Sequence, residues 1–203
     1  MSILQKYKLV SMSLLYKSRT LISGLLPVLA LTISLFDNYS PPSLYVIVGL
    51  MLCITGVLLR LWGFNYIGRF IISPEPAANE LITCGPFSYV RHPIYTATFL
   101  IIIGLILVLG PTIPIILILS TMIPYYFFLA WYEEKKLIQV LPEYNEYKKK
   151  VPMLIPSFKR RISSKQESLL SKYGKIGFIK AVLRYELATL GTLVITIVSI
   201  FFG

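Results

Sequence analysis

The chain has 203 residues, of which 56% are hydrophobic and only 14% are charged, and its mean hydropathy is +0.72. An ordinary soluble domain of this length carries more charge, so the composition argues against a soluble enzyme. The formal net charge of +11 would suit nucleic acid, but the basic residues flank apolar runs, where anionic lipid head groups attract them. We therefore expect a membrane protein whose partners include anionic lipids and no nucleic acid.

Long apolar runs recur along the chain and predict transmembrane helices. In lipid every backbone amide must be bonded within its own segment, so the predicted fold is all-α and multi-pass. Three runs have only 16 residues, roughly 24 Å at 1.5 Å per residue, and should extend into their flanks to cross a ~30 Å core. The five predicted spans are residues 21–36, 44–62, 94–109, 113–132 and 187–202.

The basic residues predict the orientation of these spans. All 20 Lys and Arg residues lie before the first span, around the loop that follows the second, or between Lys135 and Arg184. The positive-inside rule therefore places the N-terminus and these segments in the cytoplasm, and the C-terminus outside. The membrane would be the plasma membrane in a prokaryote and the endoplasmic reticulum in a eukaryote.

Three regions are predicted along the chain. Residues 1–156 form the membrane core, in which Gly110-Pro111 predicts a tight turn between spans three and four and Pro124 predicts a kink in span four. Residues 157–186 are strongly basic, with apolar residues at roughly helical spacing, and predict an interfacial linker helix or a solvated linker. Residues 187–203 form the C-terminal transmembrane helix.

Two polar clusters flank the third and fourth spans on the predicted cytoplasmic side. Arg91-His92-Pro93 precedes span three, and since proline favours a first helical turn, Arg91 and His92 should lie at a helix N-terminus whose free amides favour an anion. Glu133-Glu134 lies at or just past the end of span four, where carboxylates oppose the helix dipole unless they hold a cation. The hairpin brings both clusters to one face, where they suit a small zwitterion or simply mark the lipid–water boundary.

The segments ELITCGPFSYVRHPIY, EEKKL and PEYNEYKKKVPMLIP, with an apolar hairpin after the first, resemble the isoprenylcysteine carboxyl methyltransferase family and its phospholipid methyltransferase relatives. The upstream run LRLWGFNYIG is also similar, so the resemblance is strongest over residues 59–156. It implies S-adenosylmethionine as cofactor and a lipidic or prenylated acceptor. Carboxyl O-methylation of a prenylcysteine-like substrate is the first expectation, and N-methylation of an ethanolamine-type phospholipid is the alternative.

The resemblance also implies site residues, carried over position by position. Arg91, His92 and Tyr95 would be catalytic, with Arg91 orienting either the substrate or the cofactor carboxylate. Glu133 would bind the amino-acid end of the cofactor. The implied cofactor-binding residues are Asn79, Glu80, Leu81, Ile82, Phe87, His92, Pro93, Ile94, Tyr95, Glu133 and Glu134.

Two positions depart from the family pattern. Phe87 stands where tyrosine is usual, so one possible hydrogen bond is lost. Leu129 stands where members often carry an arginine on the substrate side, which leaves the acceptor open.

The expected chemistry needs few catalytic groups. A sulfonium methyl group is already activated, so its transfer needs positioning and a water-poor site rather than acid–base help, and no catalytic dyad is expected. One histidine and two distant cysteines, Cys53 and Cys84, provide no zinc ligand set and no disulfide. A sterol-reductase-like nicotinamide enzyme, whose motif also contains Arg-His-Pro, and a non-catalytic membrane scaffold are the remaining alternatives.

Overall fold

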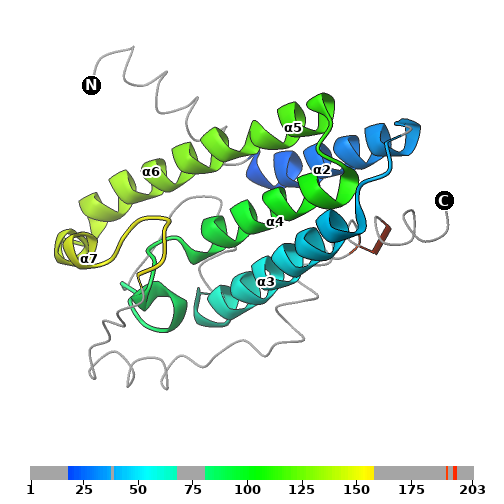
Figure 1. Cartoon of the computed structure of the whole chain (residues 1–203). Helices are drawn as coiled ribbons and strands as arrows, with labels where there is room; N and C mark the ends of the chain where they lie inside the picture. Colours follow the sequence, from blue (N-terminus) through cyan, green and yellow to red (C-terminus); the bar gives the residue numbers. More distant parts are fainter. Residues whose placement is uncertain (1–17, 38, 68–80, 158–190, 192–193, 196–203) are drawn as a thin grey trace, which may run out of the picture.

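The computed structural model describes residues 18–37, 39–67, 81–157, 191 and 194–195 (Figure 1). This part of the chain is all-α, as predicted, and contains no strand. Its elements are α2 (Arg19–Phe36), α3 (Ser43–Ile67), the 3-10 turn η1 (Gly85–Ser88), α4 (Pro93–Leu109), α5 (Ile113–Ser120), α6 (Met122–Val140) and α7 (Tyr144–Lys150).

The first four predicted spans coincide with helices. They correspond to α2, α3, α4 and the pair α5–α6. The predicted linker 157–186 and the fifth span, 187–202, lie outside the described residues apart from positions 157, 191 and 194–195.

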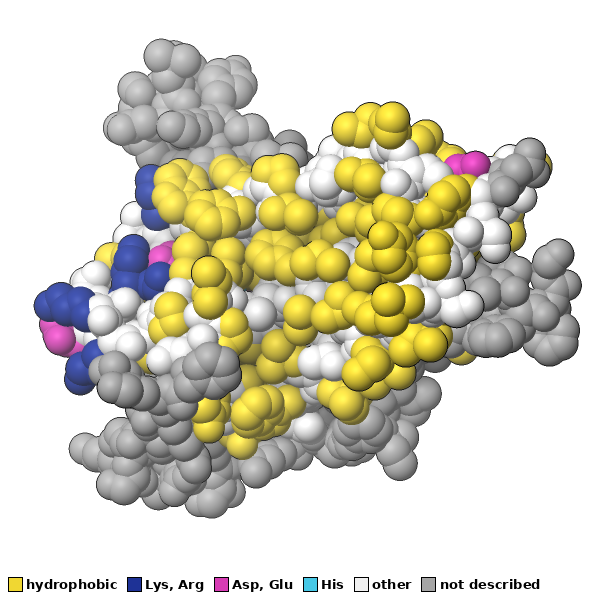
Figure 2. Space-filling view, in the orientation of Figure 1, with side chains coloured by type: hydrophobic (Ala, Val, Ile, Leu, Met, Phe, Trp, Pro, Cys, Tyr) yellow, Lys and Arg dark blue, Asp and Glu magenta, His cyan; other side chains and the backbone are white. Residues whose placement is uncertain are grey.

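Apolar side chains cover the outside of the helices. Two helices, Ser43–Tyr66 and Ile113–Val140, are long and apolar enough to cross a membrane, and Leu21–Phe36 and Pro93–Leu109 are shorter apolar helices. Only 28% and 33% of the two long apolar windows are buried inside the protein, whereas a core helix of a soluble protein is mostly buried. Figure 2 shows hydrophobic side chains across the middle of the molecule and Lys and Arg gathered at the end where α7 lies. This distribution is that of a membrane-associated protein.

Glycines allow α3 and α4 to pack closely. A Cβ atom at Gly104 would lie 2.6 Å from the carbonyl oxygen of Gly49, and one at Gly56 would lie 2.8 Å from that of Ala97. From Gly49 to Gly56 the chain runs forward along α3, while the residues opposite run backward along α4, from Gly104 to Ala97. The two helices are therefore antiparallel. Small residues at such contacts are how membrane helices approach each other without a hydrophobic driving force.

The turn predicted at Gly110-Pro111 is present, and near Pro124, where a kink is predicted, the helix is divided in two. Gly110 ends α4 with φ of 99°, which favours glycine, and α5 begins at Ile113 after only two further residues. Thr121 separates α5 from α6. Pro124 explains this interruption, because its ring crowds the carbonyl of Ser120 and it has no N–H to bond there.

The fourth predicted span is longer than expected. Its helix continues to Val140, so Glu133 and Glu134 lie about two turns before the helix end, and the expectation that they oppose the helix dipole is wrong. Glu133 is twenty residues after Ile113, about 30 Å along the axis at 1.5 Å per residue, which is the thickness of a bilayer core.

Candidate functional site

The start of α4 forms one side of the site. Pro93 begins the helix, as predicted, and His92 is its N-cap residue, although its side chain makes no capping hydrogen bond. The preceding turn η1 contains Pro86 and is buried throughout, which fixes the path of the chain into α4.

Residues 151–157, here called the strap, bind the backbone at this helix start. The amide of Arg91 donates to the carbonyl of Pro152 (2.8 Å), and the amide of His92 donates to that of Met153 (3.1 Å). The amide of Ser157 donates to the carbonyl of Tyr89 (2.8 Å). The strap therefore satisfies the amides of Arg91 and His92, so these two amides do not serve an anion at the helix start.

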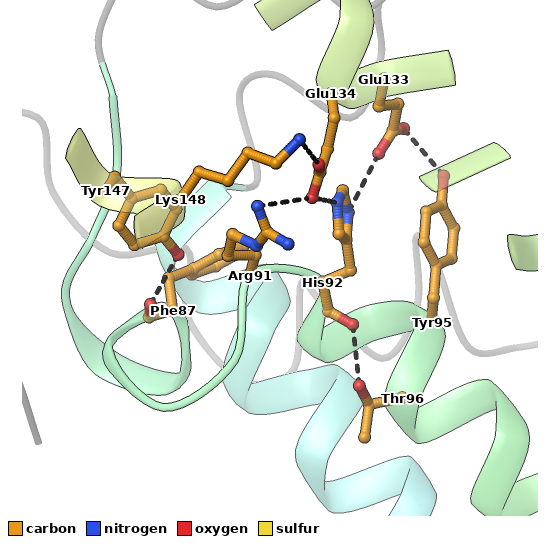
Figure 3. Close-up of polar contacts among 9 residues, drawn as sticks. All are labelled: Phe87, Arg91, His92, Tyr95, Thr96, Glu133, Glu134, Tyr147 and Lys148. Atoms are coloured by element: carbon orange, nitrogen blue, oxygen red, sulfur yellow. Dashed lines mark hydrogen bonds and ion pairs between the residues drawn. The ribbon is translucent and has the colours of Figure 1, made fainter. Parts of the chain in front are cut away.

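The two predicted polar clusters meet in space (Figure 3). His92 Nε2 lies 3.2 Å from Glu134 Oε1, and His92 Nδ1 lies 3.5 Å from Glu133 Oε2. The hydroxyl of Tyr95 donates to Glu133 Oε1 (2.8 Å), and Arg91 Nη1 lies 3.1 Å from Glu134 Oε1. The antiparallel hairpin thus brings the two polar clusters together, as expected. In the described residues the clusters bind each other through ion pairs and a hydrogen bond.

His92 is enclosed by carboxylates. Its side chain is 6% exposed, and its ring stacks on Tyr95 with ring centres 5.6 Å apart. Burial alone lowers the pKa of His92, but hydrogen bonds to Glu133 and Glu134 and their negative charges outweigh burial and raise the pKa. His92 is therefore paired with both glutamates in the folded protein.

Arg91 retains hydrogen-bonding capacity inside the protein. Its side chain is only 8% exposed, and its Nη1 contact with Glu134 is an ion pair without hydrogen-bond geometry. Its Nε atom has no hydrogen-bond partner in the described part of the chain. Buried guanidinium donors are normally satisfied, so this one is suited to a ligand carboxylate or phosphate.

Helix α7 supplies contacts that the sequence did not predict. Lys148 Nζ lies 3.3 Å from Glu134 Oε2, on the opposite carboxylate oxygen from Arg91 and His92. Tyr147 donates a hydrogen bond to the carbonyl of Phe87 (2.6 Å), and Tyr144 is fully buried beside it. Burial raises the pKa of both phenols, so they remain protonated. Nothing in the sequence distinguishes Lys148 from its neighbours Lys149 and Lys150.

The remaining predicted site residues differ in how close they lie to the cluster of Arg91, His92 and the two glutamates. Leu81 packs against a small apolar cluster in and around α7, Ile82 is half-buried, and Phe87 is buried with its carbonyl bonded to Tyr147. Pro93 and Ile94 lie in the first turn of α4. Asn79 and Glu80 lie outside the described residues.

The comparison with protein families identifies the central part of the chain. Residues 44–143, from the first turn of α3 to just before α7, match the model of the phospholipid methyltransferase family. This part of the chain is similar to that family. The matched region contains the two helices that could cross a membrane, together with Arg91, His92, Tyr95, Glu133 and Glu134. No curated protein and no solved structure matches the chain.

Proposed function

We propose that the protein is an S-adenosylmethionine-dependent membrane methyltransferase whose acceptor is the amine head group of a phospholipid. The observation that carries this proposal is the meeting of Arg91, His92 and Glu133 at the start of α4, inside the region that matches the phospholipid methyltransferase family. In this proposal the site faces the cytoplasm, because the basic residues of α7 lie at the same end of the molecule.

The residues at the site fit the amino-acid end of the cofactor. The buried Nε of Arg91 is an unused donor suited to its carboxylate, and Glu133 supplies a negative charge for its ammonium group. Of the two glutamates, Glu133 has the more exposed side chain, 19% against 6% for Glu134. We therefore assign the ligand contact to Glu133 and an internal role to Glu134.

When bound, S-adenosylmethionine supplies a methyl group that its sulfonium has already activated. The residues of the chain orient the reactants and limit the access of water. Tyr95 fixes Glu133 through a hydrogen bond, and His92 holds a proton between the two carboxylates. The buried turn η1 closes one side of the site. An acceptor lipid can approach Glu133 from the bilayer, because Glu133 lies about 30 Å along the helix from Ile113.

Two observations favour a phospholipid amine as the acceptor: the family match and the identity of residue 129, which is leucine. Isoprenylcysteine methyltransferases often carry an arginine at this position, whereas Leu129 here is fully buried in the apolar core. A phospholipid amine is therefore the better-supported acceptor, and carboxyl O-methylation of a prenylcysteine becomes the competing outcome of the test.

Two measurements test this function. Purified protein in lipid nanodiscs should bind S-adenosylhomocysteine in a calorimetric titration and should not bind NADPH. Binding of NADPH alone would instead support a sterol-reductase-like enzyme. With labelled methyl donor, phosphatidylethanolamine should become methylated and a prenylcysteine analogue should not; the reverse result would assign the acceptor to the prenylcysteine class.

A further inference from the structure

Protein groups hold both oxygens of the Glu134 carboxylate. Oε1 lies 3.1 Å from Arg91 Nη1 and 3.2 Å from His92 Nε2, and Oε2 lies 3.3 Å from Lys148 Nζ (Figure 3). A buried carboxylate is held in one orientation when cations occupy both of its oxygens. The orientation of Glu134 in turn determines where the side chains of Arg91 and His92 lie.

Lys148 comes from a segment beyond the family match. The match ends at residue 143, and α7 begins at Tyr144. The hydrogen bond from Tyr147 to the carbonyl of Phe87 fixes α7 against the turn that leads into α4. The strap that follows α7 then bonds the backbone of Arg91 and His92, so residues 144–157 hold the same helix start through side chains and backbone alike.

We propose that Lys148 is a positioning residue that acts through Glu134 and that residues 144–157 thereby complete the site. Lys148 occupies Oε2 of Glu134, which leaves Oε1 to hold Arg91 and His92 in the orientation that ligand binding needs. The part of this inference that concerns ligand affinity rests on the proposed function. The part that concerns the geometry around His92 does not.

The next residue on the same helix provides a matched control. Lys149 pairs with Glu146 at 2.7 Å, three residues earlier on α7, and both of these side chains are largely exposed. Its removal takes away the same charge and the same number of side-chain atoms without touching Glu134. Methionine keeps an unbranched side chain but lacks the charge. Lys148→Met therefore removes the contact with Glu134, and Lys149→Met does not.

His92 is the only histidine in the chain, so isotope-labelled histidine gives an NMR signal that reports this one residue. The groups that face its ring are Glu133, Glu134 and Tyr95, and Arg91 and Lys148 act on it through Glu134. In full-length protein in nanodiscs, Lys148→Met should raise the pKa of His92, because Glu134 loses a competing cation and attracts the imidazolium more strongly. Lys149→Met should leave this pKa unchanged, and Lys148→Arg should restore it.

Ligand affinity provides the second measurement. Lys148→Met should weaken the binding of S-adenosylhomocysteine by about two- to fivefold, the effect expected of one partly exposed ion pair, and Lys149→Met should not. Equal histidine pKa values and equal affinities in the two variants would overturn the inference. If the wild-type protein binds no S-adenosylhomocysteine, the proposed function fails, and the histidine titration alone still decides whether Lys148 positions the site.

Discussion

His92 before α4 and Glu134 in α6 are 42 positions apart in the sequence, yet His92 Nε2 lies 3.2 Å from Glu134 Oε1. This contact joins the two ends of the α4–α6 hairpin at the side where α7 and the strap also lie. Because Glu134 is also paired with Arg91 and Lys148, it has three cationic neighbours, whereas Glu133 contacts Tyr95 and His92. The two adjacent glutamates should therefore respond differently to substitution.

Glu133→Gln should weaken the binding of S-adenosylhomocysteine by about tenfold, or ~1.4 kcal/mol, with a smaller effect on stability, since its side chain is the more exposed of the two. Glu134→Gln should instead lower the free energy of unfolding by about 3–5 kcal/mol, because it leaves Arg91 buried beside a neutral group. Calorimetric titration and thermal unfolding of both variants check this division. If Glu133→Gln binds S-adenosylhomocysteine as tightly as the wild-type protein does, Glu133 has no ligand role.

The raised pKa of His92 makes stability depend on pH. Burial opposes the proton, but the two glutamates hold it more strongly, so the folded pKa lies above the unfolded value of about 6.5. Protonation therefore favours the folded state. This stabilisation is fully present below about pH 6.5 and is lost as the pH rises through the folded pKa.

The measurement is the unfolding temperature of the wild-type protein and of His92→Gln between about pH 6 and 9. The wild-type protein should lose stability over this range relative to the variant, which has no imidazole to titrate. Parallel curves for the two proteins would show that His92 has the same pKa folded and unfolded.

Thr96 connects the strap to the first turn of α4. Its hydroxyl lies 2.7 Å from the carbonyl of Leu154 and 3.1 Å from that of His92, and the residue is buried. Thr96→Val should lower the free energy of unfolding by about 1–2 kcal/mol, because a partly enclosed carbonyl loses its donor. Thr96→Ser keeps the hydroxyl and should retain most of that stability in thermal or denaturant unfolding. If the valine variant is as stable as the serine variant, this hydrogen bond does not secure the strap.

The sequence predicted the helices and the meeting of the two clusters because both depend on local signals. Apolar runs specify helices, Gly110-Pro111 specifies a short turn, and a short turn makes the flanking helices antiparallel. Residues just before one helix and late in the other must then lie on the same side, which is where His92 and Glu134 are found.

The strap, Lys148 and the end of α6 could not be predicted in this way. The segment VPMLIP contributed to the family resemblance, but the strap binds Arg91 and His92 through backbone groups, which any sequence carries, so the sequence does not show these bonds. Lys148 is one of three consecutive lysines, and only the angle at which α7 packs directs it to Glu134. The polar residues after Tyr132 suggested a helix end, but α6 continues to Val140 because a helix can extend beyond the bilayer with a polar surface.

The packing of α3 against α4 supports this side of the site and gives a last prediction. A Cβ atom at Gly104 would lie 2.5 Å from Cys53 Sγ and 2.6 Å from the carbonyl oxygen of Gly49, so Gly104→Ala must push the helices apart. We expect it to lower the free energy of unfolding by about 1–3 kcal/mol. Gly24→Ala is the control, because a Cβ there meets nothing within 4 Å, and its greater helix propensity should leave stability equal or higher. Unfolding of the two variants in the same detergent tests the packing directly, since equal stabilities would mean that α3 and α4 are not in close contact at Gly104.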